Sequence, residues 1–409
     1  MTPFAVPSSR AEAEARDRTD PLRSARSAFA LPPDKIYLVG HSLGPATHAA
    51  LDRTQHAASS AWAEGLVGSW NTAGWIDIPS RLGERIAPLL GAAAHDVVVC
   101  DSVSVNLFKL AAAVLPLARS AVFMVEQDEF PTDQYIAGGL AHLAGQPLRR
   151  LSREASLHAL KEGGILIKSL VSYRDGLVAD MAAYEDVAKE AGGFVIWDLS
   201  HAVGIVPVDL KAAGAQLAVG CTYKYLNGGP GSPSFLFVRD EIVETLTTPL
   251  PGWLGHREPF AFSPHYEPAD GALRFVAGTP SILSCAALDG ALDAFQGVSV
   301  LELHRKAGQL GDLCIARAQS IGLDVRSPVD AARRGGHVSL GHEAGYPLVR
   351  ALAERGIQAD FRTPDTIRLG FSPLFLRYVD VWDAMEALDV IVRERLWDEP
   401  RFHLRAKVT

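Results

Sequence analysis

The sequence lacks the features of a membrane-spanning, nucleic-acid-binding or disulfide-stapled protein. No apolar run approaches the roughly 20 residues that cross a bilayer. A net charge of −8 with no block of basic residues argues against nucleic acid as a partner. Only four cysteines occur, without metal-ligand spacing, so we expect reduced structural thiols, no metal and a cytoplasmic location; they are Cys100, Cys221, Cys285 and Cys314.

Two further absences narrow the class of protein. No Gly-x-Gly-x-x-Gly turn lies between a strand and a helix, which argues against a nicotinamide-binding protein. The first 30 residues are rich in Ala, Arg and Ser, but they are not acid-poor like a transit peptide, so a polar helical segment is expected. With 409 residues, 48% hydrophobic and 21% charged, the chain has the composition of a globular protein of about two or three domains.

The most informative stretch is CTYKYLNGGPGSP at 221–233. A buried strand is predicted at 217–222, and its end delivers Lys224 into a loop with several glycines. Lysine is rarely buried without a partner, and glycine lets a backbone turn sharply or approach a ligand closely. A second predicted strand, 194–198, ends at Asp198 and is followed by His201.

Ligands of open α/β sheets bind beyond the carboxyl ends of the strands, so Asp198, His201 and Lys224 are expected in one crevice. A strand-end lysine and a carboxylate suit pyridoxal phosphate (PLP). The lysine forms a Schiff base, and the acid keeps the pyridinium nitrogen protonated so that the ring withdraws electrons. The residues alone also allow a structural Asp–Lys pair.

The segments WDLSHAVG (197–204) and CTYKYLNGGPG (221–231) resemble kynureninase, a family of fold type I, aspartate-aminotransferase-like PLP enzymes. The resemblance extends from about Tyr37 to about Ala387. It implies an α/β fold with a large PLP-binding domain, residues 51–285, whose mostly parallel sheet is flanked by helices. A smaller α/β domain, residues 286–409, would be joined by the N-terminal segment, residues 1–50.

The hydrophobic pattern independently predicts alternating strands and helices, which favours a mostly parallel sheet covered on both faces. Expected strands are 96–100, 121–126, 165–171, 194–198, 217–222 and 235–238, with helices at 46–64, 106–118 and 180–190. The later part is expected to contain helices at 282–295, 299–320, 346–355 and 379–396, and strands at 337–340, 358–362 and 366–370.

The resemblance also implies which residues bind the cofactor. Ser104 and the backbone at Val103 lie where a helix begins, a place that favours phosphate, although plain serine capping is the alternative. Phe130 would cover one face of the ring, whereas FPTD (130–133) alone reads as a turn started by proline. The expected set is Val103, Ser104, Phe130, Pro131, Thr132, Asp133, Ser169, Asp198, His201, Tyr223, Lys224, Trp253 and Thr279.

Four residues are expected at the substrate. The family assigns Arg368 to the substrate α-carboxylate, which its guanidinium fork suits, with a structural salt bridge as the alternative. Trp70 would line the pocket for the aromatic ring and Gly278 would help shape it, although core packing is the default for a tryptophan. His41, in VGHSLGP (39–45), borders the site where the family usually has Asn, and a plain turn histidine is the alternative.

The resemblance implies an obligate homodimer. In the family a tryptophan and a Gly-Thr pair come from the second subunit. Trp253 and Thr279 would then complete the neighbour's phosphate site. Without the resemblance, an ordinary buried tryptophan would explain Trp253.

The implied activity is hydrolysis of L-kynurenine to anthranilate and L-alanine, in tryptophan catabolism or NAD biosynthesis. Lys224 would remove the Cα proton, Asp198 would stabilise the pyridinium, and Tyr223 would transfer a proton. Trp70 and Gly278 match the bacterial pattern, which favours kynurenine over 3-hydroxykynurenine. The alternatives are an aminotransferase, a cysteine desulfurase or a catalytically inactive relative, but no cysteine lies on a polar loop as a desulfurase requires.

Overall fold

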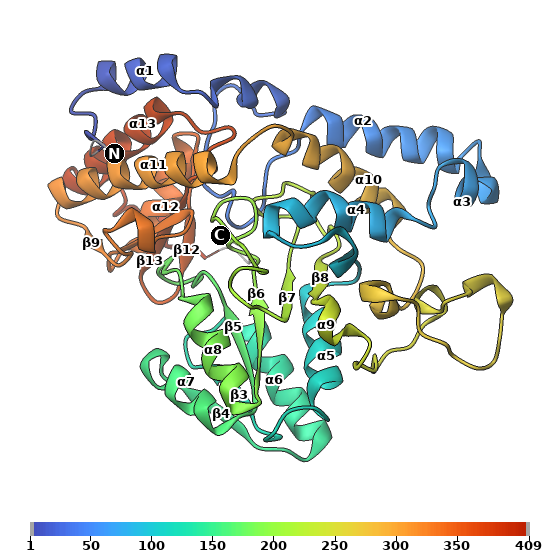
Figure 1. Ribbon diagram of the computed structural model, residues 1–409. Coiled ribbons are helices and arrows are strands. Elements are labelled where there is room, and N and C mark those ends of the chain that lie inside the picture. The colour runs from blue at the N-terminus through green and yellow to red at the C-terminus, as the bar shows by residue number, and fades with distance from the viewer. Residues whose placement is uncertain (1–3, 406–409) are drawn as a thin grey trace.

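The computed structural model describes residues 4–405 and contains sheets of seven, four and two strands. In Figure 1 the seven-stranded sheet and its helices occupy the lower part, and the four-stranded sheet lies above it with α11, α12 and α13. Helix α1 (Arg10–Thr19) packs against α13 (Tyr378–Arg393), so the N-terminal helix belongs spatially with C-terminal elements.

The large sheet has the strand order β2, β8, β7, β6, β5, β3, β4. Strand β8 alone runs in the direction opposite to the other six strands, so the predicted mostly parallel sheet is confirmed. The strands are β2 (Val97–Val99), β3 (Phe123–Glu126), β4 (Leu148–Leu151), β5 (Ile165–Ser169), β6 (Phe194–Asp198), β7 (Leu217–Gly220) and β8 (Phe235–Val238).

Alternation along the strands divides the core between the two faces of this sheet. Leu166 and Trp197 pack in one cluster with residues of α8 (Met181–Ala191). Their strand neighbours Ile167 and Ile196 pack in the other, with α5 (Val103–Val114) and α6 (Pro131–Ala144). Because successive side chains of a strand point to opposite faces, strands buried on both sides read as continuous apolar runs.

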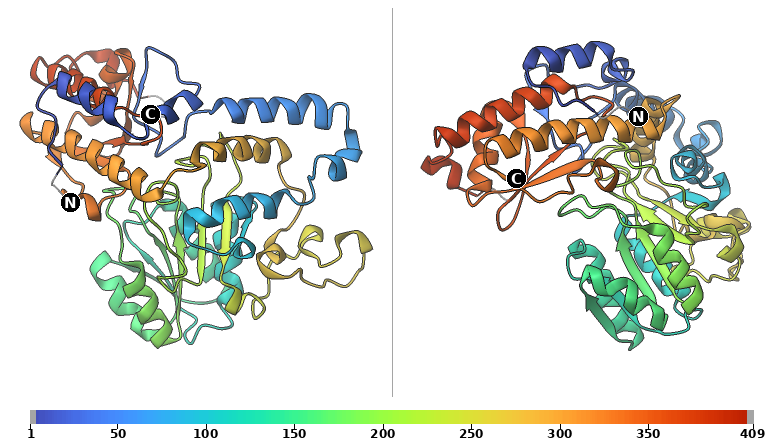
Figure 2. Two further views of the ribbon diagram at one scale, coloured as in Figure 1. Left: turned by 45° about the horizontal axis from the view of Figure 1, so that its top comes forward. Right: turned by 60° about the vertical axis from the view of Figure 1, so that its left-hand side comes forward.

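The remaining helices of this half are α2 (His48–His56), α3 (Ser69–Thr72), α4 (Ile78–Ile86), α7 (Arg153–Ala159), α9 (Asp240–Val243) and α10 (Ile282–Ala291). Of these, α4 and α7 pack on strands of the sheet, and the others lie further out. Helices α2 and α10 pack directly on each other. The left view of Figure 2 shows the segment between α9 and α10 projecting away from the sheet.

The smaller unit is built on an antiparallel sheet ordered β12 (Asp360–Arg362), β13 (Thr366–Gly370), β10 (His337–Gly341), β9 (Asp324–Val325). Helices α11 (Val300–Ser320), α12 (Gly345–Glu354), α13 and α14 (Pro400–His403) complete it. Strand β1 (Ile36–Tyr37) pairs in parallel with β11 (Ile357–Gln358), which attaches the N-terminal segment here.

Three expectations about local structure differ from what is observed. Helix α5 begins at Val103, not at residue 106, because the Ser102 side chain caps it by accepting from the Val105 N–H. FPTD opens a 14-residue helix, α6, with proline in its first turn, and not a simple turn. The single strand expected at 358–362 is two strands, β11 and β12, which pair with different partners.

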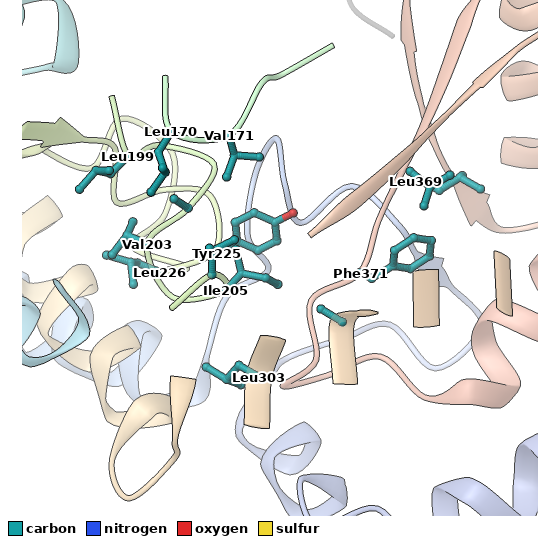
Figure 3. Packing of buried hydrophobic residues seen from close by; sticks show 14 of the residues in the cluster. Leu170, Val171, Leu199, Val203, Ile205, Tyr225, Leu226, Leu303, Leu369 and Phe371 are labelled. Atoms are coloured by element: carbon teal, nitrogen blue, oxygen red, sulfur yellow. The ribbon is translucent and has the colours of Figure 1, made fainter. Parts of the chain in front are cut away.

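A continuous apolar core joins the two units. Figure 3 shows Tyr225 among Val171 and Ile205 from the large unit, with Leu369 and Phe371 of the smaller unit nearby. The Tyr225 loop is the one that carries Lys224, so this packing fixes the lysine loop against the smaller unit. Within residues 4–405, no helix combines the length and apolarity required to span a membrane.

Candidate active site

A cavity of about 210 Å³ lies at the edge of the large sheet where β5, β6 and β7 end. Because parallel neighbours end at the same edge, distant stretches of chain deliver side chains to one place. Ten of the predicted cofactor residues line this cavity, namely Val103, Ser104, Phe130, Thr132, Asp133, Ser169, Asp198, His201, Tyr223 and Lys224. Pro131 instead lines an adjoining cavity of about 390 Å³.

Lys224 lies in a tightly hydrogen-bonded loop that follows β7. The Thr222 hydroxyl donates to the Pro233 carbonyl at 2.5 Å, and the Gly228 N–H donates to the Thr222 carbonyl at 2.9 Å. The loop needs left-handed backbone at Asn227 and Gly229, which explains its Asn-Gly-Gly sequence. Nζ of Lys224 lies 3.3 Å from Nδ1 of His201 and 5.9 Å from the centre of the Phe130 ring.

Two partners of Lys224 have shifted proton affinities. Burial, together with the nearby lysine charge, holds the pKa of His201 well below its ordinary value, so this imidazole is neutral at physiological pH. Its Nδ1 can therefore accept a hydrogen bond from the ammonium. Burial raises the pKa of the adjacent Tyr223, so its phenol remains protonated and can donate.

Acidic side chains outnumber the single lysine that lines this cavity, because Asp101, Asp133 and Asp198 all line it. Asp198 ends β6 and accepts the Ser200 N–H at 2.7 Å, and Glu129 accepts both the N–H and the hydroxyl of Ser169. Asp133 is fully buried, and neither of its oxygens has a hydrogen-bond partner among the residues described. Burial and the neighbouring Asp198 raise the pKa of Asp133 well above its ordinary value, and burial raises the pKa of Glu129. The oxygens of Asp133 therefore remain unpaired in the cavity lining, which suits a ligand that carries hydrogen-bonding groups.

The opposite wall of the cavity suits an anion. The first N–H groups of α5, at Val103 and Ser104, have no acceptor within the helix, and the helix dipole favours negative charge there. Lys109 fixes the preceding turn, because its Nζ donates to Asp101 and to the Phe275 carbonyl, both at 2.6 Å. Asp101 adopts a left-handed conformation with φ of 48°.

The site thus combines an anion cradle, acceptors for a protonated ring nitrogen, an aromatic face at Phe130 and a lysine. These groups fit PLP. Its phosphate suits the anion cradle, its ring nitrogen suits the acceptors, its flat ring suits the aromatic face, and its aldehyde suits the lysine. Asp198 and Lys224 are the acid and the amine expected from the sequence, and the structure brings them to the same cavity.

Two predicted substrate residues lie behind the cavity wall. Arg368 is only 2% exposed, and its guanidinium donates to the Asp360 carboxylate and to the Tyr173 carbonyl. His41 is completely buried; its Nε2 lies 3.4 Å from Asp360 and its ring stacks on His337. Neither residue lines the cavity in the arrangement observed.

The residues expected to serve a second subunit also lie apart from the cavity. Trp253 is 38% exposed and contacts Trp70 and Phe260 through edge-to-face ring pairs. Neither these tryptophans nor Gly278 and Thr279 line the described cavity. Gly252 keeps the two loops together, because a Cβ there would come within 1.7 Å of the Ala277 carbonyl oxygen.

Sequence reasoning missed several residues at this site. Glu129 clamps Ser169 and also accepts the Phe130 N–H at 2.9 Å. Glu129 lines a neighbouring larger cavity of about 540 Å³, together with Lys168 and Glu126, and Ser169 lines both cavities. The position of Glu129 directly before FPTD was the available signal. His337 and Lys109 gave none, because a histidine that opens a strand and a lysine within a helix are ordinary features.

The fold is shared with solved structures of other enzymes. A cysteine desulfurase from Thermococcus onnurineus NA1 superposes with a TM-score of 0.79 at 16% identity, covering 96% of this chain and 100% of that one. A C-DES mutant with glycine covalently linked to the PLP cofactor gives 0.77 at 17% identity, covering 89% and 98%. Fold and donor set together define a PLP-dependent enzyme of fold type I.

Sequence similarity is much more specific. The chain is 43% identical over 420 residues to a kynureninase of Burkholderia mallei, covering 98% of this chain and 99% of the relative. A Pseudomonas fluorescens kynureninase is 41% identical over 408 residues, covering 97% and 98%. Residues 303–388 match the family model described as the kynureninase C-terminal domain. The chain belongs to the kynureninase family.

Proposed function

We propose that this protein hydrolyses L-kynurenine to anthranilate and L-alanine with PLP as cofactor. The observation that carries the proposal is Lys224, which lies in one cavity with Asp198 and the N-terminus of α5 in a chain of the kynureninase family. In this hydrolysis the Cβ–Cγ bond breaks. The water oxygen ends on Cγ, which becomes the carboxylate carbon of anthranilate, and Cβ gains the proton that completes the methyl group of alanine.

When bound, PLP supplies an electron-withdrawing ring conjugated to the substrate Cα. Val103 and Ser104 would hold its phosphate, Asp198 its ring nitrogen and Lys224 its aldehyde group. Phe130 would cover one face of the ring, and Ser169, Thr132 and Asp133 would contact its edge. His201 and Pro131 complete the set that we assign to the cofactor pocket.

Lys224 is the base that we assign to the Cα proton. Its Nζ lies 3.3 Å from the neutral imidazole of His201, which orients the amine toward the cavity. Tyr223 would supply a proton at Cβ, because burial keeps its phenol protonated at neutral pH. Arg368 would bind the substrate carboxylate, with His41 nearby, while Trp70 and Gly278 would shape the space for the aromatic ring. That space would favour kynurenine over 3-hydroxykynurenine, which a comparison of kcat/KM tests.

We further propose a homodimer in which Trp253 and Thr279 complete the neighbour's site. The exposure of Trp253, its distance from the chain's own cavity and the projecting segment in Figure 2 support this assignment. The domain division 1–50, 51–285 and 286–409 is part of the proposal, supported by the pairing of β1 with β11. Four buried, unpaired cysteines fit the cytoplasm, a reducing compartment.

The first experiment compares the wild type with Lys224→Ala, using Lys161→Ala, an exposed lysine, as the control. The wild type and the control should show a lysine-dependent absorption band with PLP and release fluorescent anthranilate from L-kynurenine, and Lys224→Ala should do neither. A band without anthranilate would refute the proposed reaction while leaving the cofactor. Conversion of the cofactor to pyridoxamine phosphate would indicate an aminotransferase.

Subunit complementation tests the dimer. In a mixed dimer of Lys224→Ala and Thr279→Ala chains, one site carries both defects and the other is intact if Thr279 serves the neighbour. Activity should then recover when two inactive variants are mixed and reassembled. No recovery would mean that Thr279 acts within its own subunit.

A further inference from the structure

A group of buried imidazoles connects Lys224 to the Asp360–Arg368 pair. His201, which contacts Lys224, lies 5.8 Å from His337 between ring centres, and His337 stacks on His41 at 5.3 Å with planes 13° apart. His41 then contacts Asp360 through Nε2. The array runs from the proposed base to the proposed carboxylate-binding arginine, and no step described above uses His337 or Asp360.

The fold makes room for His41 at the centre of the smaller unit. His41 follows β1, and its ring lies against Gly370 at the end of β13. A Cβ at Gly370 would come within 2.1 Å of His41 Nδ1, so any larger residue at 370 would displace the imidazole. A fully buried polar ring is expected to have partners, yet neither ring nitrogen of His41 has a hydrogen-bond partner among the residues described. Asp360, 3.4 Å from Nε2, is the only acidic side chain in salt-bridge range of His41 within residues 4–405.

Asp360 sets the direction of Arg368. The two residues face each other on the paired strands β12 and β13. Oδ2 of Asp360 accepts from Nε of Arg368 at 3.2 Å and also from Nη2, while Nη1 donates to the Tyr173 carbonyl at 2.6 Å. Oδ1 accepts from Arg362 at 2.8 Å. A rotation of the Asp360 carboxylate would therefore turn the guanidinium and change which N–H groups remain for a ligand.

The charge of His41 suits an orienting role. Burial and the nearby Arg368 lower its pKa to about 4, so at neutral pH it is an uncharged donor. Burial alone would raise the pKa of Asp360, but His41 and Arg368 outweigh burial and hold that carboxylate ionised. A neutral imidazole beside Asp360 adds no further positive charge to those of Arg368 and Arg362, which already pair with this carboxylate.

We propose that His41 is a positioning residue that acts through Asp360 to hold Arg368 in the orientation that binds the carboxylate of an α-amino acid substrate. The inference rests on the proposed function, because it takes Arg368 as the carboxylate-binding residue. It predicts that the loss of the His41 donor weakens recognition of the carboxylate and leaves the chemistry at Cα and Cγ unchanged.

Two substitutions of similar volume separate hydrogen bonding from packing. His41→Gln keeps a donor within reach of Asp360, and His41→Met does not, while both lose the ring that stacks on His337. In the holoenzyme, His41→Met should raise KM for L-kynurenine about tenfold and change kcat less than about threefold, whereas His41→Gln should stay near the wild type. Equal KM values for the two variants would overturn the proposal.

Ligand binding tests the same idea without turnover. L-alanine and L-alaninamide, which lacks the carboxylate, can be titrated into the holoenzyme and followed by its absorption. His41→Met should weaken L-alanine about tenfold and leave L-alaninamide within about twofold. An equal loss for both ligands would mean a general defect of the pocket, against the proposal. This assay remains informative if the wild type forms no anthranilate, an outcome that would refute only the proposed reaction.

A double-mutant cycle checks the route through Asp360. The variant His41→Met/Asp360→Asn should bind L-alanine no more weakly than Asp360→Asn alone, because the partner of His41 is already altered. Additive effects would show that His41 acts elsewhere. If His41→Met does not fold, Asp360→Asn alone still decides the matter, because an unchanged affinity for L-alanine in that variant contradicts the proposal.

Discussion

Lys109 offers a sharp test of how the fold supports the cofactor cradle. Its side chain is completely buried in α5, and Nζ donates to Asp101 Oδ2 and to the Phe275 carbonyl, both at 2.6 Å. Asp101 starts the turn that presents the α5 N-terminus, and Phe275 ends the segment that leads to Gly278 and Thr279. Lys109→Met keeps the length of the side chain and removes both contacts.

The expected loss of stability follows from what remains after the substitution. Removal of one partner of a buried ion pair costs about 3–5 kcal/mol. The Asp101 side chain is 31% exposed, so water can partly solvate it, and we expect about 2–3 kcal/mol of unfolding free energy to be lost. The Asp101 turn should also loosen, which we expect to weaken PLP about tenfold through the phosphate contacts at Val103 and Ser104.

The assay is guanidinium unfolding of the PLP-saturated and the PLP-free protein, together with direct titration of PLP. Lys161→Met, at an exposed lysine, is the control and should be neutral. Asp101→Asn should recover part of the loss when combined with Lys109→Met, because no unpaired charge then remains. The reasoning is refuted if Lys109→Met unfolds within about 0.5 kcal/mol of the wild type.

Three further predictions concern stability. Burial raises the pKa of Glu185 to about 7, so the folded state holds a proton that the unfolded chain releases near 4.5; the stabilisation is complete below pH 4.5 and about 3 kcal/mol is lost as pH rises through 7. Glu185→Gln should flatten this slope in urea unfolding between pH 5 and 8, and an identical slope would contradict the assignment. Lys306→Met leaves Asp20 buried without its partner and should cost about 3–5 kcal/mol, measured by unfolding, with faster proteolysis of the N-terminal segment; Asp20→Asn in the same chain should restore part of both. Gly290→Ala should lower stability by about 1–3 kcal/mol, because its Cβ would lie 2.4 Å from the Ala49 carbonyl oxygen, whereas Gly139→Ala, with open space around it, should not.

The fold could be predicted where buried strands form apolar runs. The strands at 194–198 and 235–238 have the expected bounds, because both faces of each are covered and the hydrophobic signal is continuous. Strand β4 was missed because it is an edge strand with two arginines among its four residues, and its side chains are only partly buried. Helix α6 was missed because Pro131 reads as a turn, although proline fits the first turn of a helix.

The residues of the candidate site also include some that the sequence could place and some that it could not. Lys224, Asp198 and His201 could be placed together because each follows a strand of one parallel sheet, and strand ends of such a sheet converge. Glu129 and His337 could not be placed, because their roles depend on contacts across the fold. Glu129 holds Ser169 from 40 residues away, and His337 meets His41 and His201 from a different sheet.

The residues outside the cavity carry the strongest argument for a second chain. The segments that follow the strands of the large sheet line the cavity. Among the residues described, none beyond residue 250 lines it. At Gly252 the Trp253 loop packs tightly against the loop that contains Ala277 and Thr279. This part of the chain presents partly exposed rings of Trp253, Phe260 and Phe262 at the edge of the molecule. Since large exposed apolar surface is unfavourable in a lone subunit, these rings favour the proposed contact with a neighbouring copy of the chain.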